Sequence, residues 1–292
     1  MKIAFIIFLS LVLIFTIYFL LMYSPAMYRG KSELADTTKH IEITGHRGAA
    51  GLAPENTLAA IKAGLAQNVN RIEIDVHQTK DNQIVVLHDP TIDRTTNGKG
   101  YIKDMTFREI RKYSAGAWFD EKFNDEKIPS LDEVLKLISG KATLVIEIKA
   151  FDNYYQGIEK RVINIIHKHH ANDWVAVCSF DDEVLIKIHE LDKNIVLHKL
   201  FLFKFPFLKL FNDGKLRILD FQYYNFVDEF SVYYPFANKR LIKKVHSLNK
   251  KINVWTVDDT LKINRLINLG IDGIITNHPE RIPRKLNDLA KN

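Results

Sequence analysis

Charged residues at alternate positions of two apolar runs are the first sign of chemistry in this sequence. Glu73 and Asp75 flank an isoleucine, and Glu147 and Lys149 repeat that spacing in a later run. Alternate residues of a strand point to one face, so we expect these charges to share a face while the isoleucines pack behind them. Three carboxylates from two strands form a hard, oxygen-rich site suited to Mg²⁺ or Ca²⁺. The alternative is a purely structural ion network in which Arg47 and Lys149 neutralise the acids.

Two histidines and an arginine stand where other apolar runs end. His46 precedes Arg47 and Gly48, and His88 follows a later run. Imidazole titrates near neutrality, so two histidines can divide proton removal and proton donation in one reaction. A single histidine at such a position is more often structural or merely exposed. Arg47 offers a planar fork that matches a phosphate, and Gly48 allows close backbone approach. These residue types together suit a phosphate ester held beside a divalent cation.

The segments that position these residues alternate between short β-branched runs and helical periodicities. We predict strands at Ile41–Thr44, Arg71–His77, Ile84–His88, Thr143–Lys149, Trp174–Ser179, Asn194–His198, Arg217–Phe221, Lys251–Val257 and Gly273–Thr276. We predict helices at Thr57–Gln67, Leu131–Ile138, Tyr154–His170, Glu183–Leu191, Arg240–Leu248 and Leu261–Leu269. Ser130 and Glu133 have the spacing of a capping box at the start of one helix.

This alternation predicts an α/β fold with a parallel sheet, and about eight units predict a closed TIM (β/α)8 barrel over residues 40–286. Barrel enzymes place their active sites at the carboxyl ends of the strands, which is where the polar residues gather here. A doubly wound open sheet is the alternative, but no G-x-G-x-x-G follows the first strand. Residues 89–129 interrupt the alternation and are predicted to form a small insertion.

An uncharged apolar segment precedes the predicted barrel. Residues 3–23 are almost entirely Ile, Leu, Phe and Val, and 21 residues at about 1.5 Å each match the roughly 30 Å hydrocarbon core of a bilayer. We therefore expect residues 1–28 to hold one N-terminal transmembrane helix that anchors the chain to a membrane. The alternatives are a signal sequence that is cleaved on export and a soluble helix. Too few basic residues flank the segment to orient it.

Composition excludes several classes of protein. Of the 292 residues, 47% are apolar and 26% are charged, which excludes a disordered or fibrous chain. The single cysteine, Cys178, excludes an intrachain disulfide. The formal net charge of +6 is small for this length, and no basic run accompanies it, so we expect no nucleic-acid partner. No feature of the sequence indicates an oligomeric state.

Residues 199–211 combine five phenylalanines and three lysines with no acid. The lysines are Lys199, Lys204 and Lys209. One interpretation is a buried strand end followed by a core helix. The other is an interfacial element whose aromatic residues enter the headgroup region while its lysines meet anionic lipid. Tyr233, Tyr234 and Phe236 would extend that surface, and such a membrane contact would favour a lipid-bearing substrate.

Short motifs follow one another in order along the predicted barrel. They are His46-Arg47-Gly48, Ala53-Pro54-Glu55-Asn56-Thr57, Glu73-Ile74-Asp75, Thr79-Lys80-Asp81, Val86-Leu87-His88-Asp89, Asp93-Arg94-Thr95-Thr96-Asn97-Gly98, Ile128-Pro129-Ser130-Leu131, Glu147-Ile148-Lys149, Ser179-Phe180, Val254-Trp255-Thr256-Val257 and Gly270-Ile271-Asp272-Gly273-Ile274-Ile275-Thr276-Asn277. Together they resemble the glycerophosphodiester phosphodiesterase family over about residues 41–282. Their number and order make the resemblance specific, whereas a lone His-Arg-Gly would be weak.

The resemblance implies a barrel enzyme with a small insertion and one bound divalent cation. The residues on the family's functional positions are His46 and His88 for acid–base catalysis, Glu73, Asp75 and Glu147 for the metal, and Arg47 and Lys149 for the substrate phosphate. Trp255 resembles a wall residue of the substrate site, with core packing as the alternative. Glu55 and Asn56 either contact substrate or form the entry to a helix, for which Asn56 is a suitable N-cap. Asn277 is assigned a structural role only.

The activity that the resemblance implies is release of an alcohol and glycerol 3-phosphate from a glycerophosphodiester. One histidine deprotonates the substrate's own neighbouring hydroxyl, which attacks phosphorus and forms a cyclic phosphate; the other histidine protonates the leaving alcohol. Water then opens the ring. A lysophospholipase D acting on lysolipids is the alternative within this chemistry. A non-catalytic, membrane-tethered phosphate-binding module is the alternative from another class, and the intact histidines and carboxylates speak against it.

Overall fold

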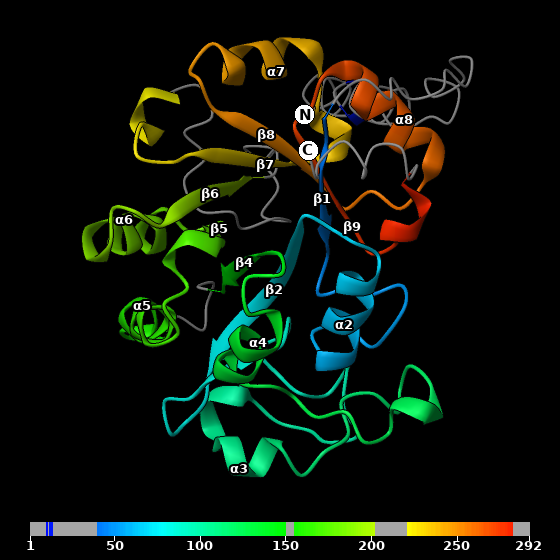
Figure 1. The fold of residues 1–292 in the computed structure, drawn as a ribbon, viewed down its shortest axis with the longest axis vertical. Helices are drawn as coiled ribbons and strands as arrows, with labels where there is room; N and C mark the ends of the chain where they lie inside the picture. Colours follow the sequence, from blue (N-terminus) through cyan, green and yellow to red (C-terminus); the bar gives the residue numbers. More distant parts are fainter. Residues whose placement is uncertain (1–9, 11, 14–39, 150–154, 202–220, 283–292) are drawn as a thin grey trace, which may run out of the picture. The chain divides into compact units, whose positions relative to one another are not determined.

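The strands of the chain belong to the second of two compact units, Asp36–Asn292, in the computed structural model. The structure describes residues 10, 12–13, 40–149, 155–201 and 221–282. Within the second unit, parallel strands alternate with helices, and the helices lie outside the ring of strands (Figure 1).

The bounds of the described elements agree with most of the predicted segments to within two residues. The strands are β1 (Glu42–Gly45), β2 (Arg71–Gln78), β3 (Ile84–Val86), β4 (Thr143–Ile148), β5 (Val175–Ser179), β6 (Val196–Phe201), β7 (Glu229–Tyr233), β8 (Lys251–Trp255) and β9 (Gly273–Thr276). The helices are α2 (Leu58–Ala66), α3 (Phe107–Ile110), α4 (Leu131–Ile138), α5 (Ile158–Lys168), α6 (Asp182–Leu191), α7 (Lys239–His246) and α8 (Thr260–Leu269). The predicted capping box is confirmed, because Ser130 and Glu133 bond reciprocally at the start of α4.

The strands close into a barrel because β1 pairs with β9 on one side and with β2 on the other. The order around the ring is β1, β9, β8, β7, β6, β5, β4 and β2, and every pairing in it is parallel. β3 pairs with β2 in the antiparallel direction, outside the closed ring. The predicted TIM barrel is confirmed, and the open doubly wound sheet is excluded.

Alternation along β2 separates its acids from its isoleucines. Ile72 is fully buried on the outer face, where its Cδ1 atom packs so close to Gly64 of α2 that a Cβ on the glycine would lie 2.6 Å away. Glu73 faces the barrel interior and lines its cavity. Asp75 lies directly opposite Glu147 of β4, so the parallel register by itself brings two acids together.

The seventh barrel strand lies at Glu229–Tyr233, so the strand predicted at Arg217–Phe221 is wrong. Phe221 begins a short 3-10 segment, Phe221–Tyr224, and the rest of the predicted range lies outside the described residues. The true strand was hard to recognise because its inward residues, Glu229 and Ser231, are polar. Arg71 binds both carboxylate oxygens of Glu229 inside the barrel, which makes burial of that charge tolerable.

Residues 89–129, the predicted insertion, contain only short helical segments: Ile102–Asp104, α3 and Glu121–Phe123. In Figure 1 this stretch lies beyond α4, with α3 at the lower edge of the view. It has an apolar cluster shared with β3 and the residues that follow it, formed by Val85, Leu87, Ile92, Ile102, Ile110, Ala115 and Ile128. The segment is therefore held against the barrel by its own packing.

The structure describes only part of the predicted membrane contact: residues 199–201 of the aromatic segment, and Tyr233, Tyr234 and Phe236. Lys199 is buried in β6, where its ammonium contacts the Asp182 carboxylate at 2.8 Å, so its predicted contact with lipid is wrong. Lys204 and Lys209 lie outside the described residues, as does nearly all of the predicted anchor at residues 3–23. In the part of the chain that the structure describes, no helix has the length and apolar character needed to cross a membrane.

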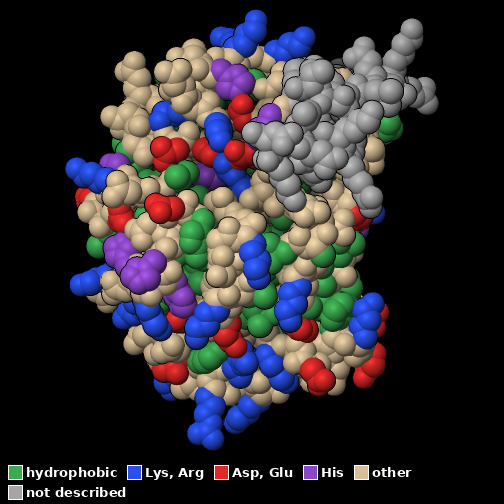
Figure 2. Space-filling view, viewed as in Figure 1, with side chains coloured by type: hydrophobic (Ala, Val, Ile, Leu, Met, Phe, Trp, Pro, Cys, Tyr) green, Lys and Arg blue, Asp and Glu red, His purple; other side chains and the backbone are tan. Residues whose placement is uncertain are grey.

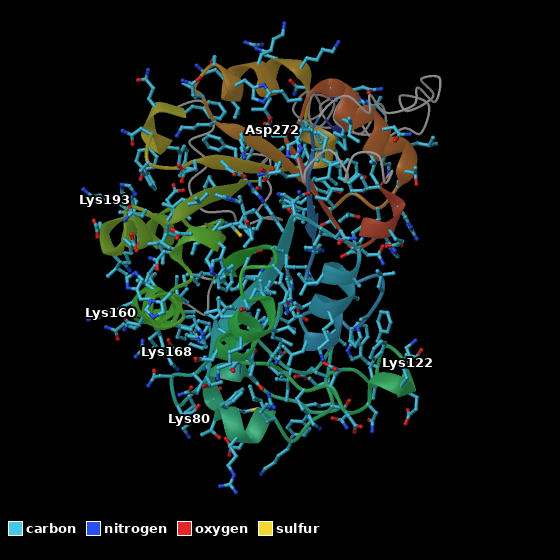
Figure 3. All side chains as sticks on the ribbon, in the orientation of Figure 1. Lys80, Lys122, Lys160, Lys168, Lys193 and Asp272 are labelled. Carbon is cyan, nitrogen blue, oxygen red and sulfur yellow. The ribbon has the colours of Figure 1, made fainter. Side chains whose placement is uncertain are left out.

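Basic side chains are dispersed over the face of the molecule drawn in Figure 2. Figure 2 shows Lys and Arg at the top, the left edge and the bottom of the drawn face, with acidic side chains between them. Figure 3 labels lysines that project outward from different elements, among them Lys80 after β2, Lys160 on α5 and Lys193 after α6. The drawn surface thus has no single basic stripe of the kind that follows a nucleic-acid backbone.

Candidate active site

A cavity of about 120 Å³ opens where the carboxyl ends of the barrel strands meet. Its polar lining includes His46, Arg47, Glu73, His88, Glu147 and Lys149, and its apolar lining includes Phe180, Leu200 and Trp255. The cavity therefore brings together most of the residues that the sequence singled out: four separate segments supply the charged wall, and a fifth supplies Trp255. One wall is charged and the other apolar, which is the layout expected for a ligand with a charged head and an apolar or polyol remainder.

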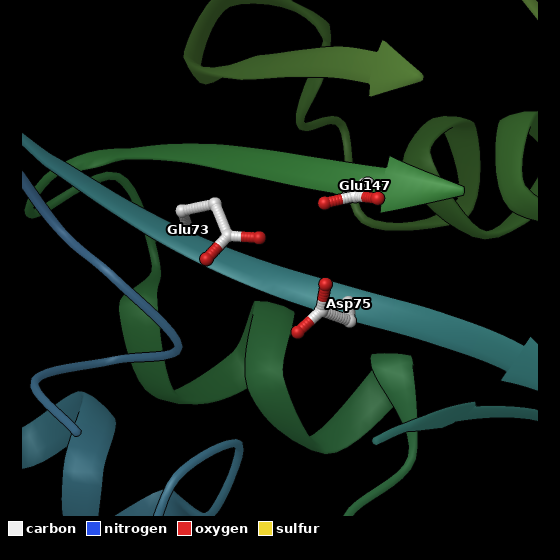
Figure 4. Close-up of side chains that lie close together, drawn as sticks. All are labelled: Glu73, Asp75 and Glu147. Atoms are coloured by element: carbon white, nitrogen blue, oxygen red, sulfur yellow. The ribbon is translucent and has the colours of Figure 1, made fainter. Parts of the chain in front are cut away.

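Three buried carboxylates converge between β2 and β4 (Figure 4). One oxygen from each of Glu73, Asp75 and Glu147 lies within 4.8 Å of the others. Burial, together with the neighbouring acids, raises the pKa of Glu73 well above its ordinary value. Burial raises the pKa of Glu147 to about 7. Such shifts indicate excess negative charge, which a hard divalent cation would neutralise, so this donor set fits Mg²⁺ or Ca²⁺.

Lys149 and Arg47 supply part of the compensating charge. The Lys149 ammonium lies 2.8 Å from Oδ1 of Asp75 and also contacts Glu147, while Nε of Arg47 lies 3.5 Å from Oδ2 of Asp75. Burial would raise the pKa of Asp75, but Lys149 and its other neighbours hold it below the ordinary value. The predicted ion network therefore exists. It shares its members with the carboxylate cluster, and two cations beside three acids leave that cluster negative.

The turn from His46 to Gly48 ties β1 to β2. Arg47 has a φ of 51°, and Gly48 has a φ of 93°. A Cβ on Gly48 would meet the backbone of Ala60 at 2.6 Å, so the position requires glycine. The amide of Gly48 donates to the carbonyl of Glu73 at 3.0 Å, and the amide of Arg47 donates to the Glu73 carboxylate at 2.8 Å. This conformation points the neighbouring side chains into the cavity.

His46 is held by an amide rather than by a carboxylate. Its Nδ1 lies 2.7 Å from Oδ1 of Asn277, and its Nε2 lies 3.9 Å from the Glu73 carboxylate. Asn277 in turn donates to Asp258 from its side-chain amide and its backbone amide, each at 2.8 Å. Burial, followed by the nearby Arg47 charge, lowers the pKa of His46 to about 4. The imidazole is therefore neutral near pH 7, with its proton on Nδ1 and the Nε2 lone pair toward the site.

His88 is held differently and is half-buried. Its Nδ1 donates to Oδ1 of Asp89 at 2.7 Å, and its backbone carbonyl accepts from Nε2 of His77 at 3.0 Å. Burial lowers the pKa of His88, and the Asp89 carboxylate opposes that shift. Asp89 is itself bound by Arg94 of the insertion, and its pKa falls to about 2 against the effect of burial. The two histidines thus have unlike partners, as a proton donor and a proton acceptor require.

Asn56 supports the carboxylate cluster instead of capping a helix, so its predicted N-cap role is wrong. Its side-chain amide donates to Oδ2 of Asp75 at 2.8 Å, and its Oδ1 accepts the backbone amide of Asp75 at 3.2 Å. The N-cap of α2 is Thr57, whose backbone is extended and whose hydroxyl accepts from Ala60. Asn56 has a φ of 58°, the left-handed conformation, which is unsuited to an N-cap.

Trp255 both lines the cavity and packs against other aromatic residues, so it combines the two roles that the sequence left open, a wall of the substrate site and core packing. It lines the cavity, and its ring packs edge-on against Phe180 with centroids 5.6 Å apart. Its indole nitrogen donates to the carbonyl of Ser231 at 3.1 Å, which fixes the ring. Tyr233 packs behind it at 5.4 Å. The result is a rigid apolar wall facing the charged residues.

Sequence reasoning gave no functional role to four residues that hold the site together: His77, Asp89, Arg94 and Asp258. Asp89 and Arg94 lie within the quoted motifs, and Asp258 directly follows one of them. Charged and imidazole side chains of this kind can orient a neighbouring histidine or arginine, but only the folded barrel shows which partner each of them contacts. Asn277, expected to be structural, is the direct hydrogen-bond partner of His46.

Comparisons with known proteins agree with this geometry. The sequence model of the glycerophosphoryl diester phosphodiesterase family matches residues 46–281. The chain is 36% identical to a glycerophosphodiester phosphodiesterase of Caldanaerobacter subterraneus subsp. tengcongensis, over 82% of this chain and 95% of that protein. Its fold is similar to a crystal structure of glycerophosphodiester phosphodiesterase from Agrobacterium tumefaciens, with a TM-score of 0.68, 26% identity and coverage of 82% and 98% of the two chains.

A phosphodiesterase of Oleispira antarctica, solved in complex with the product sn-glycerol-3-phosphate, has a similar fold at a TM-score of 0.74. It is 23% identical to this chain, and the similarity covers 84% of this chain and 96% of that one. The family match spans nearly the whole described barrel and contains every residue of the charged wall. The chain belongs to the glycerophosphoryl diester phosphodiesterase family and is a phosphodiester hydrolase.

Proposed function

We propose that this chain hydrolyses glycerophosphodiesters to an alcohol and glycerol 3-phosphate, with one divalent cation, Mg²⁺ or Ca²⁺, as cofactor. The observation that carries the proposal is the meeting of the buried acids Glu73, Asp75 and Glu147 with two differently held histidines in one cavity. Family membership supports the reaction class, and the donor set supports the cation.

The charged wall would bind the substrate phosphate. Glu73, Asp75 and Glu147 would hold the cation, which when bound neutralises charge on the phosphodiester oxygens. Arg47 would present its guanidinium fork to the same oxygens, and Lys149 would add a point charge. The side chains of Arg47 and Lys149 both contact Asp75, so a phosphate bound to them would lie close to the acids and the two histidines.

His46 and His88 would move the protons. Nε2 of His46 carries a lone pair near the cavity, so in its neutral form this atom accepts a proton. His88, bonded to the Asp89 carboxylate, is stabilised when protonated. The substrate's neighbouring hydroxyl would attack phosphorus to give a cyclic phosphate, and the leaving alcohol would take a proton from a histidine. The roles then reverse as water opens the ring.

The decisive experiment is an assay of the purified chain against glycerophosphocholine with Mg²⁺ and Ca²⁺ in turn. We expect glycerol 3-phosphate and choline as products, with activity lost in EDTA. His46→Ala should abolish turnover and leave the circular dichroism spectrum unchanged. Release of phosphocholine instead of choline, or near-wild-type turnover by His46→Ala, would overturn the proposal.

A second candidate activity is lysophospholipase D, which would release choline or ethanolamine from a lysolipid and leave lysophosphatidic acid. The apolar wall of Phe180, Leu200 and Trp255 favours it, because an acyl chain needs such a surface. The same assay with lysophosphatidylcholine decides between the two substrates by their kcat/KM values.

We also propose that residues 3–23 anchor the enzyme to a membrane. The support is the length and uncharged character of the segment. Cell fractionation of the full chain and of a chain lacking residues 1–28 tests this. Recovery of the full chain from the soluble fraction, or an N-terminus trimmed beyond residue 23, would contradict an uncleaved anchor.

A further inference from the structure

One arginine of the insertion connects two residues of the site that lie on different strand ends. Arg94 follows β3, and its side chain is 46% exposed. Its guanidinium donates to two carboxylates at once. Nε and one terminal nitrogen bind Asp89 at 2.7 and 3.1 Å, and both terminal nitrogens bind Glu55 at 2.9 and 2.8 Å. All three nitrogens of the fork are therefore engaged.

Each of these carboxylates also binds a residue of the cavity. Oδ1 of Asp89 accepts from Nδ1 of His88 at 2.7 Å, and the same oxygen accepts from Arg94. Oε1 of Glu55 accepts from Arg47 at 2.7 Å, and the same oxygen accepts from Arg94. The oxygens shared in this way make a continuous path from His88 through Asp89, Arg94 and Glu55 to Arg47.

We propose that Arg94 is a positioning residue that fixes the imidazole of His88 and the guanidinium of Arg47 in one relative geometry. The inference rests on the proposed function, in which His88 moves a proton and Arg47 binds the phosphate. A planar fork with fixed donor directions can orient two carboxylates at once, which a lysine, with one ammonium, cannot do. The insertion thereby takes part in assembling the site.

A positioning role for Arg94 predicts a larger effect on kcat than on folding stability. The Arg94 side chain is nearly half exposed, so solvent screens its ion pairs and loss of Arg94 should change stability little. Catalysis is more sensitive, because displacement of a reacting group by about 1 Å can cost on the order of 100-fold in rate. Loss of Arg94 should therefore reduce kcat by far more than it reduces stability.

Arg94→Ala, Arg94→Lys and the control Arg111→Ala test the proposal in the full chain. Arg111 lies in the same insertion and pairs with both oxygens of Glu133, away from the cavity. We expect kcat on glycerophosphocholine to fall on the order of 100-fold in Arg94→Ala and to stay reduced at least about 10-fold in Arg94→Lys. Arg111→Ala should keep the wild-type kcat. Low millimolar guanidinium should restore part of the activity of Arg94→Ala.

A second measurement does not depend on turnover. Nitrogen-15 spectra of the histidine rings, with His88 assigned through His88→Gln, report the Nδ1 proton bonded to Asp89. We expect this signal to shift or broaden in Arg94→Ala and to remain in Arg111→Ala. If the wild-type chain does not cleave glycerophosphocholine, the proposed function fails and this spectrum alone decides the role of Arg94. An unchanged His88 signal, or a kcat for Arg94→Ala within about threefold of wild type, would overturn the proposal.

Discussion

Asn277 orients His46 only because Asp258 orients Asn277. An amide can present either its oxygen or its NH₂ group, and Asp258 accepts the side-chain NH₂ of Asn277 at 2.8 Å. The amide oxygen is thereby directed at Nδ1 of His46, 2.7 Å away. Asn277 separates the Asp258 carboxylate from the imidazole, so the tautomer of His46 is fixed without a carboxylate bonded to Nδ1.

Asp258→Asn should uncouple this arrangement. The new amide has one acceptor oxygen instead of two, so it cannot accept from both the backbone amide and the side-chain NH₂ of Asn277. Asn277 can then turn its NH₂ toward His46 and compete with the Nδ1 proton. We expect kcat on glycerophosphocholine to fall at least about 10-fold, with a melting temperature within a few degrees of wild type. The matched control is Asp259→Asn, because Asp259 caps α8 and asparagine caps equally well. Equal kcat values for the two variants would contradict the coupling.

Lys149 and Lys199 allow the proposed cation site to be distinguished from an ordinary buried ion pair. Both ammonium groups are buried against an acid, Asp75 for Lys149 and Asp182 for Lys199. Breaking either pair should destabilise the fold, by roughly 3–5 kcal/mol for a fully buried pair. Both variants retain the carboxylate cluster, but only Lys149→Gln removes a positive charge from beside it, where a bound divalent cation can take its place.

Thermal unfolding with and without Mg²⁺ or Ca²⁺ makes this comparison. We expect a cation at one hundred times its wild-type Kd to raise the stability of wild type by about 2.7 kcal/mol, and to raise that of Lys149→Gln by more, because the cluster without the ammonium attracts the cation more strongly. The Lys199→Gln protein should gain no more than wild type, so its deficit relative to wild type should persist, whereas the deficit of Lys149→Gln should shrink. A Lys149→Gln protein that does not respond to either cation would favour a purely structural ion network.

The sequence determined the barrel and the chemistry of the site better than the connections between its residues. Alternation of acids and isoleucines along β2 was readable because the strand period does not depend on tertiary contacts. The N-cap of α2 could not be predicted in the same way. Asn56 adopts the left-handed conformation because its side chain bonds to Asp75, and this leaves Thr57 as the N-cap. The position of the N-cap therefore depends on a contact between side chains 19 residues apart in the sequence.

Long-range partners account for the other differences. The interfacial interpretation of residues 199–211 placed Lys199 against lipid, but its ammonium is buried against Asp182 and the carbonyl of Phe180. The strand containing Glu229 was missed because Arg71, 158 residues earlier, neutralises that acid inside the barrel. Both contacts depend on which strands and helices become neighbours in the fold, and the secondary-structure propensity of single residues does not contain that information.

His198 should make stability depend on pH. Burial lowers its pKa to about 4 from an ordinary value of 6.5, so between these values the unfolded chain binds more protons than the folded chain. Stability therefore falls as pH is lowered through this window, by roughly 2 kcal/mol between pH 7 and pH 5 for this one group. Urea unfolding of His198→Gln should show a pH dependence smaller by that amount. His246→Gln, which replaces an exposed histidine beside Asp272, is the matched control. A pH dependence of His198→Gln equal to that of wild type would refute the assignment.

Trp255→Ala tests which part of the substrate meets the apolar wall. Truncation removes most of the apolar surface between Phe180 and Tyr233, and burial of apolar area stabilises a complex by about 25 cal/mol per Å². A glycerophosphocholine has little apolar area to lose there, whereas the acyl chain of lysophosphatidylcholine has a great deal. We therefore expect KM to rise about tenfold for the lysolipid and less than about threefold for glycerophosphocholine.

Trp118→Ala is the control for this comparison, because Trp118 is exposed in the insertion and does not line the cavity. It should leave both KM values unchanged. Equal effects of Trp255→Ala on the two substrates would place the acyl chain elsewhere and remove the main structural support for lysolipid hydrolysis. A selective effect would instead make the rigid pair of Trp255 and Phe180 the acyl-binding surface, opposite the proposed phosphate site at Arg47 and Lys149.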